Sequence, residues 1–169
     1  MAIGAIGREY DLTFKCGSTL KTSTSLYRCV AIVPNTSTAV DYTVEACVSV
    51  AAAALDFTIA AFHAIGICQS ENNSNSENCS VRVFGVSKAI CAASVGVGTF
   101  VCAYYGASTT SRIGNIQVAG QSGETCGAYG HTATVHQVVL GRALESGSTG
   151  TVISIMLNPQ LYDKKLLDE

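Results

Sequence analysis

Eight cysteines are the residues of this chain best suited to chemistry, because thiolates bind zinc, attack electrophiles and form disulfides. They lie at positions 16, 29, 47, 68, 79, 91, 102 and 126. No two are separated by two to four residues, so the paired spacing of zinc ribbons, thioredoxin-like centres and haem attachment sites does not occur. Most have strand-like apolar neighbours, as Cys102 does in Phe100-Val101-Cys102-Ala103. We therefore expect buried structural thiols and no metal site.

The other groups that could catalyse a reaction are scattered. The three histidines are His63, His131 and His136. The last two are five residues apart, which places them on opposite faces of a strand. Ser148 lies in Gly-Ser-Thr-Gly, which lacks the spacing of a nucleophile elbow. Glu71 and Glu77 belong to a polar segment that would not raise a carboxyl pKa for acid catalysis. The sequence predicts no catalytic residue, no cofactor and no enzymatic activity.

The composition excludes further classes of protein. Charged residues make up 13% of the 169 residues, and the formal net charge is −2. Such a chain has no electrostatic means of holding a phosphate backbone, so we expect no nucleic-acid partner. Its 48% apolar residues exclude a disordered tail protein. The first eight residues lack the basic segment and apolar run of a secretory signal peptide, which predicts a protein made in a cytoplasm.

One stretch, Ala89 to Ser111, contains no charged residue over 23 positions and would be long enough to span a membrane. It also contains Gly96, Gly98 and Gly106, with Val alternating with Gly. Buried strands joined by turns fit this pattern better than a membrane helix. We therefore expect no membrane partner.

Short runs rich in β-branched and aromatic residues, punctuated by Gly, Asn and Ser, predict strands through most of the chain. The clearest runs are Tyr10–Phe14, Tyr27–Val33, Tyr42–Val50, His63–Cys68, Ser80–Val86, Thr99–Tyr105, Val135–Leu140 and Thr151–Leu157. Eight short strands indicate an all-β domain, either a small β-barrel or a β-sandwich. Residues 51–61 fit a strand or a short helix equally well. The polar segment Gln69–Asn78 predicts a loop.

The two ends differ in character from this single β domain, which we expect over residues 10–160. Residues 1–8 are mostly apolar and glycine-spaced, which predicts an extended N-terminal arm over residues 1–9. Residues 161–169 form a charged C-terminal tail. Between Ala89 and Gly141 the only charged residues are Arg112 and Glu124. Such a segment is either deeply buried, packed against another chain, or simply a set of glycine-rich flexible loops.

The second half of the chain, read as a whole, is more informative. Four segments follow one another: Ala64-Ile-Gly-Ile-Cys68; Cys79-Ser-Val-Arg-Val-Phe-Gly-Val-Ser-Lys-Ala89; Gly96-Val-Gly-Thr-Phe-Val-Cys102; and Val138-Val-Leu-Gly-Arg-Ala-Leu-Glu-Ser-Gly-Ser-Thr-Gly-Thr-Val-Ile-Ser-Ile-Met-Leu-Asn-Pro159. Their order over residues 63–159 resembles the capsid cement, or head decoration, proteins of tailed bacteriophages. The closing element at 139–159 carries most of the resemblance. The eight cysteines and the long Gln69–Asn78 loop depart from the usual pattern of that family.

The resemblance implies a structural virion protein that binds the outer surface of a phage head and stabilises the shell. Its partners would be the major capsid protein and two further copies of itself in a homotrimer. The residues that we expect to contact the capsid lie in the N-terminal arm: Ile3, Ile6, Arg8 and Tyr10. The alternatives are a receptor-binding or carbohydrate-binding module of a phage tail or surface, and a membrane-active protein such as a holin. The absence of Trp weakens the carbohydrate-binding alternative.

A phage protein folds in a reducing cytoplasm and then leaves it, so its cysteines could oxidise in the released particle. Cys68 and Cys79 bracket the polar loop, each next to a predicted strand, as the closure of a hairpin requires. They are the candidate pair for a disulfide if any of the eight cysteines oxidise in the particle. The competing hypothesis is that all eight cysteines stay as buried thiols.

Overall fold

The protein is described here by a computed structural model. The described residues are 9–17, 20, 25–33, 43–47, 64–71, 77–104, 112, 114–119 and 136–163. Within these ranges the chain forms nine β-strands and no α-helix, which confirms the all-β class. The strands are β1 (Tyr10–Cys16), β2 (Cys29–Val33), β3 (Thr43–Ala46), β4 (Ala64–Cys68), β5 (Asn78–Ile90), β6 (Phe100–Ala103), β7 (Ile116–Val118), β8 (His136–Ala143) and β9 (Val152–Asp163).

Five of the strands close into a small barrel in the order β1-β3-β2-β4-β5, with β5 pairing back onto β1. The β1–β3 pair is parallel, and the other pairs of the ring are antiparallel. Closure of the ring satisfies the backbone donors and acceptors that an open sheet would leave at its edges.

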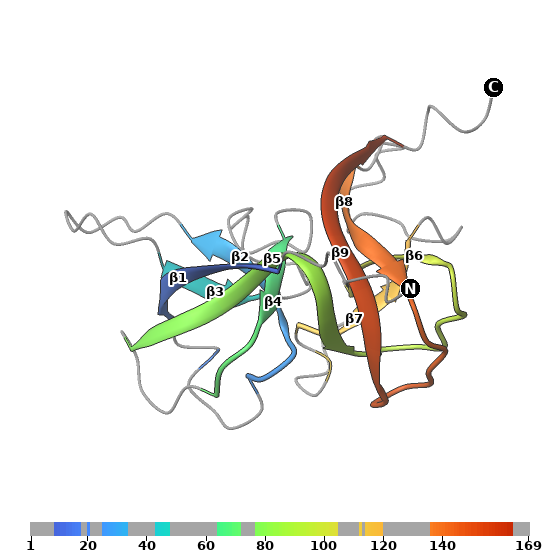
Figure 1. Cartoon of the computed structure of the whole chain (residues 1–169), viewed down its shortest axis with the longest axis horizontal. Coiled ribbons are helices and arrows are strands. Elements are labelled where there is room, and N and C mark those ends of the chain that lie inside the picture. The colour runs from blue at the N-terminus through green and yellow to red at the C-terminus, as the bar shows by residue number, and fades with distance from the viewer. Residues whose placement is uncertain are drawn as a thin grey trace, which may run out of the picture.

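A second sheet extends from the same strand β5, in the order β5-β9-β8-β6-β7. Figure 1 shows β5, in green, running from the barrel into this second sheet. The first part of β5 pairs with β1 and β4, and the part from Gly85 onward pairs with β9. Gly85 stands at the change of partner with φ of 99°, a backbone conformation that glycine adopts without steric cost.

Two apolar cores explain why the central strands read as unbroken apolar runs. In β2, Val30 and Ile32 face the barrel interior, whereas Cys29 and Ala31 face a second core. That second core lies between the barrel wall and the inner face of the second sheet, from which Ile155 and Leu157 of β9 pack inward. A strand that is covered on both faces has no polar positions to alternate with.

Each of the eight expected strand runs contains or overlaps an observed strand. Strand β7 was not expected, because three residues are too few to show a period of two. Strand β9 continues to Asp163, since residues 161–163 find ladder partners in Val138, Gln137 and His136. It therefore includes the first three residues of the segment that we expected to be a tail. The segment 51–61 and most of the arm lie outside the described residues. No helix of the described ranges is long and apolar enough to cross a membrane.

Candidate interaction surface

The expected capsid-contact residues Ile3, Ile6 and Arg8 lie outside the described part of the chain. Tyr10 begins β1, where it pairs with Phe84 of β5, and its side chain is exposed. The described chain therefore enters β1 beside the bend of β5.

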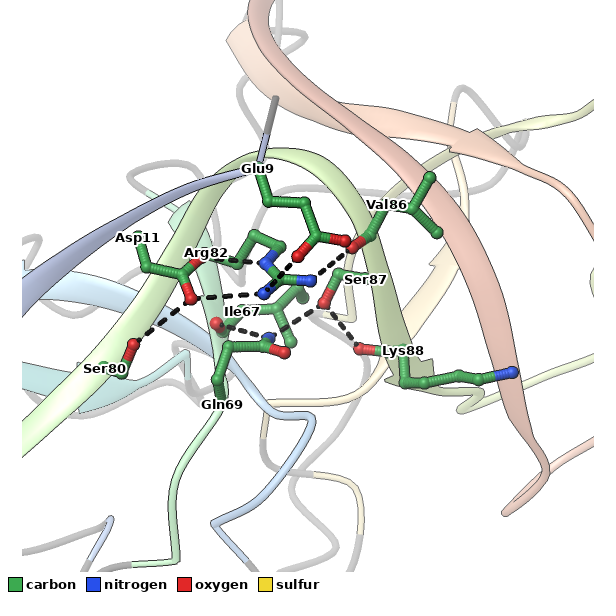
Figure 2. Close-up of polar contacts among 9 residues, drawn as sticks. All are labelled: Glu9, Asp11, Ile67, Gln69, Ser80, Arg82, Val86, Ser87 and Lys88. Carbon is green, nitrogen blue, oxygen red and sulfur yellow. Dashed lines mark hydrogen bonds and ion pairs between the residues drawn. The ribbon is translucent and has the colours of Figure 1, made fainter. Parts of the chain in front are cut away.

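Arg82 connects the start of β1 to the bend of β5 (Figure 2). Its Nε donates a hydrogen bond to Asp11 Oδ1 at 2.8 Å, and its Nη2 donates to Asp11 Oδ2 at 3.2 Å. The same Nη2 lies 2.9 Å from Glu9 Oε2, and Nη1 donates to the carbonyl oxygen of Val86 at 2.7 Å. The Arg82 hydrogen bonds and charge hold the pKa of Asp11 below its usual range. One guanidinium thus joins the start of β1 to the bend of β5.

A second polar link lies on the neighbouring strand, also visible in Figure 2. Gln69 follows β4, and its Nε2 donates to the carbonyl oxygen of Ile67 at 2.9 Å and to Ser87 Oγ at 2.8 Å. Ser87 Oγ in turn donates to the carbonyl oxygen of Lys88 at 3.1 Å. Ser87 is buried, so these bonds satisfy a hydroxyl that would otherwise be costly inside the protein. The bend of β5 is therefore fixed from both sides.

The second sheet presents an exposed apolar face to solvent, on the side opposite its buried core. One straight row crosses four strands: Val86 lies opposite Met156, Met156 opposite Arg142, and Arg142 opposite Phe100. Leu144 and Val152 are also exposed large apolar residues of this sheet. We call the set the outer face, and it consists of Val86, Phe100, Arg142, Leu144, Val152 and Met156.

Charges at the outer face are few. The Arg142 guanidinium carbon lies 4.5 Å from the centroid of the Phe100 ring, a cation–π contact. Lys88 Nζ lies 3.5 Å from Glu145 Oε2 and donates to Ser154 Oγ at 2.8 Å. The backbone amide of Ser154 donates to the same Glu145 carboxylate at 2.8 Å, which lowers the pKa of Glu145. No carboxylate of the described ranges lies within ion-pair distance of Arg142.

The predicted disulfide partners lie close together as thiols. Cys68 and Cys79 are buried in the barrel core, where their thiols are neighbours. Cys16 shares this core and also lies beside Cys79. Burial raises the pKa of Cys16 to about 11, and the neighbouring thiols and burial raise that of Cys79. The pairing of Cys68 with Cys79 stays a prediction, and Cys16 is a neighbour that the spacing did not reveal.

An open groove of about 560 Å³ lies where the barrel meets the second sheet. Its lining is mostly apolar and comes from β4, the bend of β5, β8 and β9: Ala64, Ile65, Val83, Phe84, Val138, Asn158, Pro159 and Gln160. The side-chain amides of Asn158 and Gln160 supply the polar groups. Among the described residues no group of His, Cys, Asp or Glu is arranged to hold a metal ion.

No protein-family model matches the sequence. No curated protein matches it either. A similar solved structure is the head fiber gp8.5 N base in bacteriophage phi29, with a TM-score of 0.45 and 12% identity over 92% of this chain and 98% of that chain. A likeness at this TM-score and identity carries no conclusion about function.

The outer face was not predicted from the sequence, although the sequence carries a signal for it. Residues 152–157 read Val-Ile-Ser-Ile-Met-Leu. Alternate residues of a strand point to opposite faces, and here the residues of both faces are apolar except for Ser154. Ile153, Ile155 and Leu157 are buried, whereas Val152 and Met156 are exposed. A run of this kind is typical of a strand covered on both faces. In the described part of the chain, only one face of β9 is covered.

Proposed function

We propose that the protein is a structural component of a tailed-phage head, a decoration protein that binds the outer surface of the shell and stabilises it. The observation that carries the proposal is the outer face: contiguous exposed apolar surface in a folded domain is typical of a protein–protein interface. The resemblance of residues 63–159 to head decoration proteins supplies the partner class. The strongest part of that resemblance, 139–159, folds as the β8–β9 hairpin, which contributes Arg142, Leu144, Val152 and Met156 to the face.

The fold suits such a role. A closed barrel joined to a second sheet through one continuous strand has few exposed ladder edges, and it can present a stiff surface. A protein that binds the assembled shell and not its dissociated parts stabilises the assembly by mass action. On a lattice of repeated sites, many individually weak contacts are enough to stabilise the shell. The partners in this proposal are the major capsid protein and two further copies of the chain in a homotrimer, with the N-terminal arm adding contacts.

Co-sedimentation tests the proposal. Heads that lack this protein, prepared from the virus that encodes it, are mixed with the purified full chain and pelleted. We expect saturable binding and a higher temperature of head disruption. Heads that already carry the protein are the control and should take up little more. If the chain stays in the supernatant at all head concentrations, the proposed function is wrong.

The groove favours one second candidate, a carbohydrate-binding module of a phage tail or surface. Phe84 is an exposed aromatic residue that lines the groove together with Asn158 and Gln160, and sugars bind to sites that combine aromatic rings with a few polar groups. A glycan array probed with the full chain tests this candidate. Binding that is lost in Phe84→Ala would favour it over head decoration.

A further inference from the structure

The outer face belongs to strands whose sequence indicates burial on both sides. In β9 the inward residues Ile153, Ile155 and Leu157 fill the core, whereas Val152 and Met156 belong to no core of the described residues and are exposed. The cross-strand neighbours of Met156 are Val86 and Arg142. Exposure of Met156 is 42%, which leaves much of a large flexible side chain available for contact.

The charge of Arg142 indicates which kind of partner could cover the outer face. Its one cation is Arg142, and no carboxylate of the described ranges lies within ion-pair distance of it, whereas the nearby Lys88 is paired with Glu145. A second copy that docked with the same face would bring a second unmatched arginine to the contact. A partner that is apolar and bears a carboxylate would instead pair with Arg142 and bury Met156 and Phe100.

We propose that the outer face is the surface that binds the shell protein of the head, and that it fits an apolar patch on that protein carrying at least one carboxylate opposite Arg142. The inference rests on the proposed function and goes further, because it assigns the contact to the β5–β9–β8–β6 sheet. Met156 and Phe100 lie in one row with Arg142, so a partner carboxylate that reaches the guanidinium also covers apolar side chains. Those side chains exclude water from the contact, and the exclusion of water strengthens the ion pair.

The test measures binding of full-length variants to heads that lack the protein. Met156→Glu places a carboxylate in the apolar row next to Arg142, and Arg142→Glu reverses the unmatched charge. The matched control is Leu12→Glu on the barrel strand β1, because Leu12 is 43% exposed, against 42% for Met156. Circular dichroism and thermal melting establish that each variant is folded, which the exposure of all three side chains predicts.

We expect both outer-face variants to weaken head binding by about tenfold or more, and Leu12→Glu to bind as the unsubstituted chain does. Added salt should weaken binding of the unsubstituted chain more than that of Arg142→Glu. If the unsubstituted chain binds heads and the two variants bind equally well, this inference is overturned while the proposed function stands. If the unsubstituted chain binds no heads, both are overturned. If Met156→Glu instead converts an oligomer of the isolated chain into monomers, as seen by analytical ultracentrifugation, the face joins copies of this chain and the shell-binding inference is wrong.

Discussion

Arg82 is the residue on which the geometry of the β5 bend depends. Its side chain is largely covered, and its three nitrogens meet two carboxylates and a backbone carbonyl. A single exposed ion pair contributes little to stability, about 0–1 kcal/mol. A bidentate pair that also holds a backbone carbonyl fixes direction as well as distance. The guanidinium therefore ties the start of β1 to the place where β5 leaves the barrel and enters the second sheet.

Asp11→Asn should weaken this arrangement in a pH-dependent way. The folded state lowers the pKa of Asp11 below 3.8, so the ionised carboxylate stabilises the fold above that pH, and the contribution is lost as the pH falls below it. We expect the variant to lose about 0.5–1 kcal/mol near pH 6, after screening by solvent, and to show a smaller further loss than the parent between pH 6 and pH 3. Thermal melts at the two pH values measure this. The control is Glu71→Gln, an exposed carboxylate in the segment after β4. Equal pH dependence of Asp11→Asn and the parent chain would contradict this role of Asp11.

Cys68 and Cys79 are the pair of thiols expected to oxidise to a disulfide. Two thiols would lose two protons and two electrons to an oxidant such as dioxygen or glutathione disulfide, closing a loop of about a dozen residues and stabilising the fold by ~3 kcal/mol. The raised pKa of the Cys79 thiol should make the reaction slow near pH 7 and faster in alkali, since the thiolate reacts.

Alkylation of the denatured, unreduced protein from released particles, followed by mass spectrometry, counts the thiols. Six alkylated cysteines and a linked 68–79 peptide are expected. Eight alkylated cysteines would exclude the bridge, and a linked 16–79 peptide would show that Cys16 is the partner instead. Protein kept in reductant throughout is the control.

At the scale of elements, the β8–β9 hairpin depends on one close approach of two backbones. Gly141 lies opposite Leu157, and a Cβ at position 141 would stand 1.9 Å from the carbonyl oxygen of Met156. No side chain fits there unless the strands separate. The register shift between Val139 and Gly141 marks the same place as an irregularity in the ladder.

Gly141→Ala should therefore destabilise the protein by about 2–3 kcal/mol, because β8 and β9 must move apart and the inward residues of β9 lose contacts. Chemical denaturation measures the loss. The control is Gly96→Ala, whose added Cβ would meet nothing closer than Thr99 Cγ2 at 3.5 Å. A variant at position 141 as stable as the one at position 96 would contradict this account of the hairpin.

Strand positions could be predicted from the sequence because alternation and turn residues are local signals. The pairing could not, since closure of β5 onto β1 joins residues about 70 apart and leaves no local trace. The proximity of Cys68 and Cys79 followed from their place beside one loop, whereas the contact of Cys16 with Cys79 depends on that long-range closure. The outer face was missed for a related reason: whether the apolar set Val152 and Met156 is covered depends on packing beyond the strand.

At the scale of the whole molecule, attachment through a homotrimer and an N-terminal arm remains a prediction. Glu9 contacts Arg82 and Tyr10 pairs with Phe84, at the junction of barrel and second sheet. An arm of eight fully extended residues starting from this point would span about 26–29 Å.

A chain lacking residues 1–8 should occupy fewer sites on heads than the full chain at the same concentration. Burial of Ile3 and Ile6 is worth roughly 1.5–3 kcal/mol each before ordering costs. Quantitative gel analysis of pelleted heads measures the occupancy. The control replaces Ile3 and Ile6 by Ser in the full-length chain, which separates apolar contact from arm length. Undiminished occupancy in both variants would mean that the arm contributes nothing to attachment.

Electron cryo-microscopy of phage heads that contain the chain, compared with heads that lack it, tests the proposed decoration of the head. Head decoration predicts additional density on the outer surface of the shell at repeated lattice positions. The barrel and second sheet should fit that density with the row of Val86, Met156, Arg142 and Phe100 facing the shell. Density confined to the tail, or no difference between the two kinds of head, would contradict the claim that this protein decorates the head.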